Sequence, residues 1–208
     1  MPRSFIALVL DEATRHGVAA QVECLRPLSR AVAWVPPQNL HLTLKFLGEQ
    51  SEERLGVVRS VLEAAAAGIA PFALTLHGVG GFPGLDRPRI LWVGVSEGAL
   101  AVRQLQARVE EGLARHGFSR ETRSWHPHLT IGRVFDDRRW RREGTPALRE
   151  AVARAARLDL GRVPVAAIWL MRSDLSPAGA RHTALASMPL RPDGPGATGA
   201  GAPSDGQS

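Results

Sequence analysis

A pattern of alternating polar and apolar residues around a histidine and a threonine occurs twice in this chain, once in each half. Residues 39–48 read NLHLTLKFLG, and residues 125–133 read WHPHLTIGR. In an extended strand successive side chains point to opposite faces, so the histidine and threonine of each copy share one face and the apolar residues take the other. We therefore expect two strands that are each held to a core by leucine or isoleucine and that each display one imidazole and one hydroxyl.

The four polar residues of the two copies are His41, Thr43, His128 and Thr130. Imidazole has an ordinary pKa of about 6.5, so it acts as an acid or a base near neutral pH. Hydrolysis of a phosphodiester needs one proton taken from water and one given to the leaving oxygen, which two imidazoles supply together. Threonine hydroxyls can donate hydrogen bonds to the phosphate oxygens. A single His-x-Thr would indicate little, but two matched copies favour a phosphodiesterase site, without saying which histidine is the acid.

A metal site is the main alternative use of these histidines. His126 and His128 are two positions apart and could face one way, but Pro127 disturbs the strand between them. Neither motif contains an aspartate or glutamate to complete a shell for a hard metal. We therefore expect no metal and no cofactor.

The only cysteine is Cys24, which excludes an intrachain disulfide and a cysteine-based zinc site. It lies in the helical pattern VAAQVECLRPL. A small buried residue is the expectation there, in preference to a catalytic thiol.

The formal net charge is +6, and Lys45 is the sole lysine among 26 basic residues. Arginine favours an anionic partner such as RNA, although genome composition can also enrich arginine. No apolar run reaches the roughly 18 residues that a membrane helix needs. The short apolar run at the N-terminus stops at Asp11, which is unlike a secretory signal, so we expect a cytoplasmic protein.

Strands and helices are expected to alternate along most of the chain. The final stretch, residues 191–208, is rich in Gly, Pro, Ala and Ser, so we expect a disordered tail after a folded unit over residues 1–190. Apolar periodicity predicts strands over residues 5–10, 40–47, 72–77, 90–95, 128–134, 163–171 and 181–188. It predicts helices over residues 11–30, 51–67, 96–116 and 145–157. The similar order of elements in each half indicates two lobes that face each other.

At these residues the chain resembles the two-histidine (2H) phosphoesterase superfamily, and within it the RNA 2′,3′-cyclic phosphodiesterases, also called the LigT-like or 2′-5′ RNA ligase family. The resemblance extends from about Arg3 to Leu190. It covers WVPPQNLHLTLKFLG at 34–48, GGFP at 80–83, RILWVGV at 89–95, HPHLTIGR at 126–133 and LMRSDL at 170–175.

The resemblance implies an α+β fold in which two pseudo-symmetric lobes place antiparallel sheets along a central cleft, with helices outside. It implies hydrolysis of RNA 2′,3′-cyclic phosphate ends, or of small cyclic nucleotides, to 2′-phosphates. His41 would be the proton donor, His128 the proton acceptor, and Thr43 and Thr130 would hold the phosphate. The family also permits the reverse 2′-5′ ligation. We expect no membrane partner and a monomer.

Several further residues have two interpretations each. Counting by two along the strand points Arg133 away from His128, yet the family retains a basic residue there, so a role in contacting phosphate or RNA is the alternative. Phe46 either packs in the core or stacks a base. Residues 136–142, DDRRWRR, form a solvated loop or an RNA-contacting flap. His182 is either a third His-x-x-x site or a surface histidine, and the surface position is the expectation. The segment Arg181-His182-Thr183 stands where the family commonly has an aromatic residue, often tyrosine, so a base-stacking contact there is in doubt.

Two other functions remain open on the sequence alone. A related 2H enzyme could act on ADP-ribose 1″,2″-cyclic phosphate or on 2′-5′ oligonucleotides. A non-catalytic module could bind RNA through its arginines, with the histidines only packing. A panel of substrates separates the first from the main hypothesis, and salt-dependent RNA binding without turnover would favour the second.

Overall fold

The computed structural model describes residues 3–143, 146–176 and 179–192. The strands are β1 Arg3–Val9, β2 Val32–Trp34, β3 His41–Glu49, β4 Phe72–Phe82, β5 Ile90–Val95, β6 His128–Val134, β7 Asp159–Val165, β8 Ala167–Ser176 and β9 Gly179–Pro189. The helices are α1 Glu12–Leu25, α2 Glu52–Ala66, α3 Ala99–Arg115, α4 Asp137–Glu143 and α5 Pro146–Ala155. Short 3-10 turns cover Arg26–Leu28 and Pro37–Asn39.

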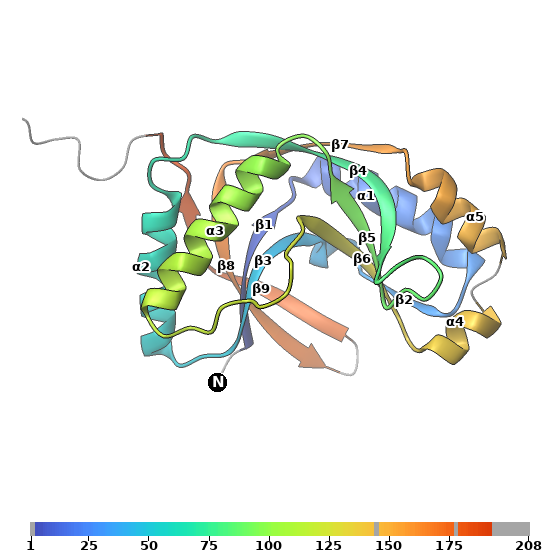
Figure 1. Ribbon diagram of the computed structural model, residues 1–208, viewed down its shortest axis with the longest axis horizontal. Coiled ribbons are helices and arrows are strands. Elements are labelled where there is room, and N and C mark those ends of the chain that lie inside the picture. The colour runs from blue at the N-terminus through green and yellow to red at the C-terminus, as the bar shows by residue number, and fades with distance from the viewer. Residues whose placement is uncertain (1–2, 144–145, 177–178, 193–208) are drawn as a thin grey trace, which may run out of the picture.

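The strands form one antiparallel sheet in the order β7-β4-β5-β6-β3-β1-β8-β9, with β2 paired to β6. The sheet curls into a half-barrel with a concave face, and the helices lie outside it (Figure 1). The predicted α+β fold is thus confirmed. The two expected lobes are the two halves of this sheet, which meet where β3 pairs with β6.

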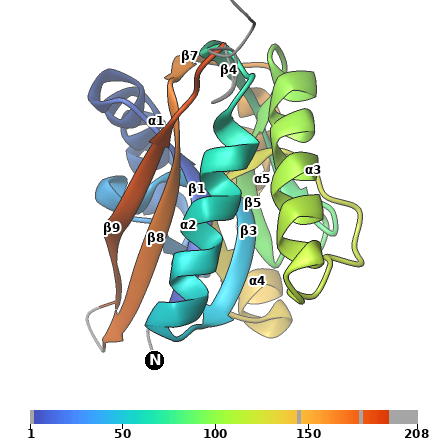
Figure 2. The ribbon, with the colours of Figure 1, turned by 90° about the vertical axis from the view of Figure 1, so that its left-hand side faces the viewer.

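Each half of the sheet is covered by its own pair of helices. Helices α2 and α3 contact each other and pack on β8, β9 and β3 (Figure 2). Helices α1 and α5 contact each other and pack on β7 and β4. Helix α1 follows β1, which lies in one half of the sheet, but packs on the other half. The first two elements of the chain therefore connect the two halves.

The two helices with clear sequence signals begin where those signals lie. The Asp11 carboxylate accepts a hydrogen bond from the backbone N–H of Thr14 at the start of α1. The Ser51 hydroxyl accepts one from the N–H of Arg54 at the start of α2. These side chains satisfy donors that have no partner inside a helix.

Strand β4 is longer than its sequence suggests. The strand predicted over residues 72–77 continues through the glycine-rich segment GVGGF to Phe82. A Cβ at Gly80 would lie 2.3 Å from the ring of Trp92 on the neighbouring strand. The glycine therefore allows the close approach of this indole to the strand backbone, and the predicted end of the strand at residue 77 was wrong.

The strand predicted over residues 163–171 is two strands. Strand β7 pairs with β4 in one half, and β8 pairs with β1 in the other. The chain crosses between the halves at Ala166, whose carbonyl accepts a hydrogen bond from the N–H of Leu190. Both strands are apolar and adjacent in sequence, so hydrophobicity alone did not reveal the crossing.

Residues 137–143 form helix α4, where the sequence suggested an irregular loop. The Asp136 carboxylate accepts a hydrogen bond from the N–H of Arg139, and Trp140 is 2% exposed. One buried tryptophan and one capping aspartate help to hold this short arginine-rich helix against the body. Strand β2, which follows α1, was not predicted either.

None of the helices in the described ranges is long and apolar enough to cross a membrane. The disordered tail predicted over residues 191–208 lies outside the described residues, apart from Arg191 and Pro192.

Candidate active site

The two histidine motifs meet at the centre of the sheet, where β3 pairs with β6. Leu42 lies opposite Leu129 in this antiparallel pair, and both leucines are buried under the helices. The residues on either side of each leucine therefore face the concave side. In an antiparallel pair, the neighbours of two opposed residues also lie opposite each other. The four side chains brought together in this way are His41 beside Thr130 and His128 beside Thr43.

The two imidazoles are held in the same manner. Nδ1 of His41 lies 2.8 Å from the carbonyl oxygen of Asn39, and Nδ1 of His128 lies 2.8 Å from that of His126. A carbonyl oxygen can only accept, so Nδ1 carries the hydrogen in both rings. In each neutral ring Nε2 is then the atom left to take or give a proton.

A phenylalanine ring backs each histidine. The ring centroid of Phe5 lies 4.7 Å from that of His41, and the centroid of Phe82 lies 5.1 Å from that of His128 in an edge-on arrangement. These rings shield one side of each imidazole from water. Sequence reasoning missed this role of both, although Phe5 alternates correctly in the first strand and Phe82 follows the conspicuous glycines of β4.

A bulge in β3 changes which residues face the concave side. Pairing with β1 skips Leu44, so the alternation changes phase after it. Lys45 therefore points to the helices, where its Nζ lies 2.7 Å from Glu110 Oε1. Phe46 returns to the side of the histidine and is 69% exposed, with its ring 6.2 Å from that of Phe5. The alternative that Phe46 packs in the core was wrong.

A second bulge does the same in β6. Pairing with β5 skips Ile131, so Arg133 lies on the side of His128 and not away from it, as counting by two had suggested. The charge of Arg133 lowers the pKa of both His41 and His128, after the larger effect of burial. Each bulge lies three residues after its histidine, so Phe46 and Arg133 occupy equivalent positions.

A third histidine lies beside the first. The ring of His182 on β9 is 5.1 Å from that of His41 and 4.9 Å from that of Phe5. The Asn39 side chain donates a 2.6 Å hydrogen bond to the carbonyl of Ala180, which ties β9 to the residue whose own carbonyl holds His41. The expectation that His182 is a surface residue was wrong, because the beginning of β9 packs against the first motif and leaves the ring half-buried.

All three histidines titrate below the ordinary range. Burial lowers the pKa of His41 to about 4, the hydrogen bond to Asn39 opposes that shift, and the charges of His182 and Arg133 add to it. Burial also lowers the pKa of His128 and of His182. At neutral pH these rings are therefore uncharged in the free protein. A bound anion would favour their protonated forms.

Among residues 3–143, 146–176 and 179–192, no group of three or more His, Cys, Asp or Glu side chains is placed to hold a metal ion.

A cavity of about 530 Å³ lies on the opposite face of the sheet, between α1 and α5. It is lined mainly by apolar side chains, including Val93 and Ile131, and lies away from the histidines. Cys24 borders it and is exposed, so the expectation that this cysteine is buried was wrong. Helix α1 packs through Val18 and Leu25 instead.

The chain belongs to the 2′-5′ RNA ligase superfamily. The model of that family matches residues 15–177, which is most of the chain. The α+β fold with one antiparallel sheet and two histidine strands agrees with what the resemblance in sequence implied.

Individual relatives agree with this assignment. A protein of Methanothermobacter thermautotrophicus named RNA 2′,3′-cyclic phosphodiesterase is 34% identical over 181 residues, which cover 87% of this chain and 95% of that protein. One of the same name from Aquifex aeolicus is 34% identical over 184 residues, or 87% and 93% of the two chains. Among solved structures, E. coli LigT complexed with 3′-AMP has a TM-score of 0.71 at 26% identity, over 91% of this chain and 98% of that one.

Proposed function

We propose that this protein hydrolyses the 2′,3′-cyclic phosphodiester at the end of an RNA strand to a 2′-phosphate. The observation that carries the proposal is the pair of imidazoles that meet on the concave face, each with Nδ1 held by a carbonyl and Nε2 left for proton transfer. The names of the curated relatives support the substrate class.

In the proposed reaction, Nε2 of His128 takes a proton from water as its oxygen attacks phosphorus. The bond between phosphorus and the 3′ oxygen breaks, and Nε2 of a protonated His41 gives its proton to that oxygen. Both histidines end in the opposite protonation state, and exchange with solvent restores them. Thr43 and Thr130 donate hydrogen bonds to the non-bridging oxygens, where charge builds up.

The low pKa of His41 has to be reconciled with its role as the acid. A free-protein value of about 4 leaves few molecules protonated at neutral pH. The cyclic phosphodiester carries one negative charge, which raises the pKa of a histidine beside it. We infer that substrate and proton bind together, so the acid is formed in the complex.

Arg133 and Phe46, the equivalent residues beyond the two bulges, would bind two different parts of the substrate, the phosphate and the terminal base. The Arg133 guanidinium, which acts on both histidines, would bind the phosphate. The exposed ring of Phe46 would stack the terminal base. Because one chain supplies both motifs, we propose that the protein works as a monomer. We also propose that it forms a 2′-5′ linkage when a 5′ hydroxyl attacks phosphorus in place of water: His128 takes the proton of that hydroxyl, and the same 3′ oxygen leaves with the proton of His41.

Product analysis on adenosine 2′,3′-cyclic phosphate in EDTA tests the proposal. The expected product is the 2′-phosphate, formed at the same rate with and without chelator. The 3′-phosphate as product, loss of turnover in EDTA, or no turnover at all would overturn it. ADP-ribose 1″,2″-cyclic phosphate and a 2′-5′ dinucleotide in the same assay show whether the site prefers another substrate.

A further inference from the structure

The concave face of β6 continues beyond Arg133 to an exposed aromatic residue. The N–H of Phe135 donates to the carbonyl of Ala31 at 3.1 Å, so the chain stays extended for one residue past the strand. Alternation then places Phe135 on the same side as Arg133. Its ring is 56% exposed, and the guanidinium carbon of Arg139 lies 4.4 Å from the ring centroid.

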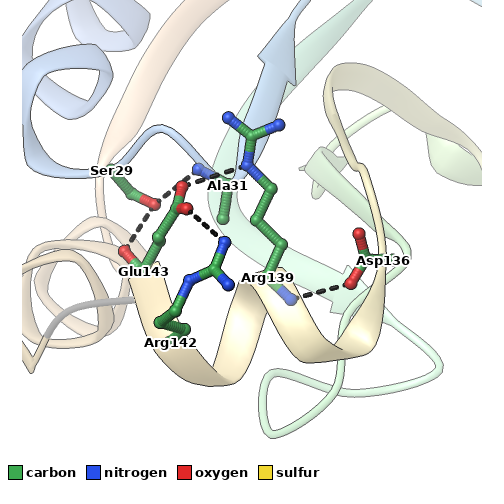
Figure 3. Close-up of polar contacts among 6 residues, drawn as sticks. All are labelled: Ser29, Ala31, Asp136, Arg139, Arg142 and Glu143. Carbon is green, nitrogen blue, oxygen red and sulfur yellow. Dashed lines mark hydrogen bonds and ion pairs between the residues drawn. The ribbon is translucent and has the colours of Figure 1, made fainter.

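This aromatic–guanidinium pair is held in place by the protein. In Figure 3, Arg139 and Arg142 both reach the carboxylate of Glu143, with Arg139 Nε 3.0 Å from Glu143 Oε2. The Ser29 hydroxyl donates to the carbonyl of Glu143 at 2.7 Å. Helix α4 is also anchored by the indole N–H of Trp140, which donates to the carbonyl of Asp86 at 3.1 Å. The pair is therefore preorganised before any ligand arrives.

The edge of the protein formed by residues 83–89 and 133–143, around Phe135, carries an excess of positive charge. Residues 83–89 and 133–143 contain seven arginines and four carboxylates, an excess equal to half of the formal net charge of the whole chain. Within the ranges that the structure describes, Arg87, Arg138 and Arg141 are exposed and have no carboxylate partner. A stacking ring among unpaired arginines is the combination that binds single-stranded nucleic acid.

The position of this edge decides which part of a substrate could reach it. Phe135 follows His128 by seven residues, roughly 20 Å along an extended strand. That is more than the length of one nucleotide, so a cyclic mononucleotide bound at His128 would not reach Phe135. An RNA strand would.

We propose that Phe135, Arg139 and the exposed arginines of α4 form a second binding site, for the single-stranded RNA that lies upstream of the cyclic end. The proposal rests on the proposed function and extends it, since it makes RNA chains better substrates than mononucleotides. Phe135 stacks a base, Arg139 supports the ring, and Arg138 and Arg141 neutralise phosphates.

The test compares two substrates, adenosine 2′,3′-cyclic phosphate and a hexaribonucleotide that ends in a 2′,3′-cyclic phosphate. Phe135→Ala is expected to lower kcat/KM for the hexamer by about 5- to 150-fold, the range for removing the stacking of one base. It should leave kcat/KM for the mononucleotide within about twofold, and Phe135→Trp should retain hexamer activity. Leu100→Ala, an exposed apolar residue on α3, is the matched control.

Arg138→Gln with Arg141→Gln tests the electrostatic part. The double variant should reduce the salt dependence of kcat/KM for the hexamer, by about 0.7 in the log–log slope for each phosphate that an arginine no longer neutralises. It should leave the salt dependence for the mononucleotide unchanged. Equal effects of these changes on both substrates, or no effect on the hexamer, would overturn the proposal.

If the wild-type protein turned over neither substrate, the proposed function would fail separately. Fluorescence anisotropy with a labelled hexaribonucleotide would still test the second site. Weaker binding by Phe135→Ala would support it, and unchanged binding would overturn it.

Discussion

The ring of His182 meets that of His41 edge-on at 5.1 Å, and both rings contact Phe5. This chain therefore places a titratable ring against the proposed acid. The charge of His182 lowers the pKa of His41. The proposed acid is therefore adjusted by a residue that lies outside both sequence motifs.

Replacing His182 by phenylalanine should raise the pKa of His41. The change keeps a ring against Phe5 and removes the charge that opposes protonation of His41. An acid must be protonated to work, so the fall of kcat/KM at high pH should move to higher pH. Titration of the ¹⁵N-labelled imidazoles by NMR gives the midpoint directly. The control is His116→Phe, at the exposed residue that follows α3, which should leave the midpoint of His41 unchanged. An unchanged midpoint in His182→Phe would show that His182 only packs against His41.

Asn39→Ala should slow the reaction without touching a reacting group. The Asn39 side chain is buried, and its removal leaves the Ala180 carbonyl without that donor, at a cost of about 1–3 kcal/mol in unfolding free energy. The backbone that positions His41 is then less constrained, so kcat should fall by up to about 100-fold, with a smaller change in KM. Ser124→Ala is the control in the other half, because the exposed Ser124 bonds the ring of His126 and not the His126 carbonyl that holds His128. Equal kinetics for the two variants would argue against a positioning role for Asn39.

Lys45→Met should destabilise the protein by about 3–5 kcal/mol, because it leaves the Glu110 carboxylate buried without its cation. The double variant Lys45→Met with Glu110→Leu should recover most of this stability. Urea unfolding measures both. Breaking the exposed ion pair of Arg172 and Asp174 by Arg172→Met should cost about 1 kcal/mol or less. A similar cost for the two single changes would contradict the buried placement of Lys45.

A substrate that needs no acid separates the roles of the two histidines. A p-nitrophenyl phosphodiester loses its leaving group without protonation. His41→Ala should therefore retain much of its activity on this substrate, relative to the cyclic phosphate, whereas His128→Ala should be defective on both. The opposite pattern would mean that His128 is the acid and His41 the base.

Alternation in the sequence predicted the two histidine strands and the residues that share a face near Leu42 and Leu129. It failed three residues after each histidine, because one extra residue at Leu44 or Ile131 reverses the alternation for the residues that follow. A bulge of this kind leaves little trace in the pattern of apolar residues. The positions of Lys45, Phe46 and Arg133 were therefore beyond counting by two.

The place of His182 depended on information that no local pattern contains. The sequence predicted a strand around it, but not that β9 would pair with β8 and bring its beginning against η2, the Pro37–Asn39 turn before His41. Helix α4 was missed for a different reason. Its stability comes from Trp140 and its hydrogen bond to Asp86, more than 50 residues earlier, and its exposed arginines resemble those of a loop.

The central claim is that His41 and His128 are the acid and base of one reaction. The most direct measurement is kcat/KM on a 2′,3′-cyclic phosphate for His41→Ala, His128→Ala and the double variant, with folding checked by circular dichroism. General acid–base catalysis predicts a loss of about 100-fold to 10,000-fold for each single change, and a double variant less impaired than the product of the two losses. Activity within about threefold of wild type in either folded single variant would contradict the account.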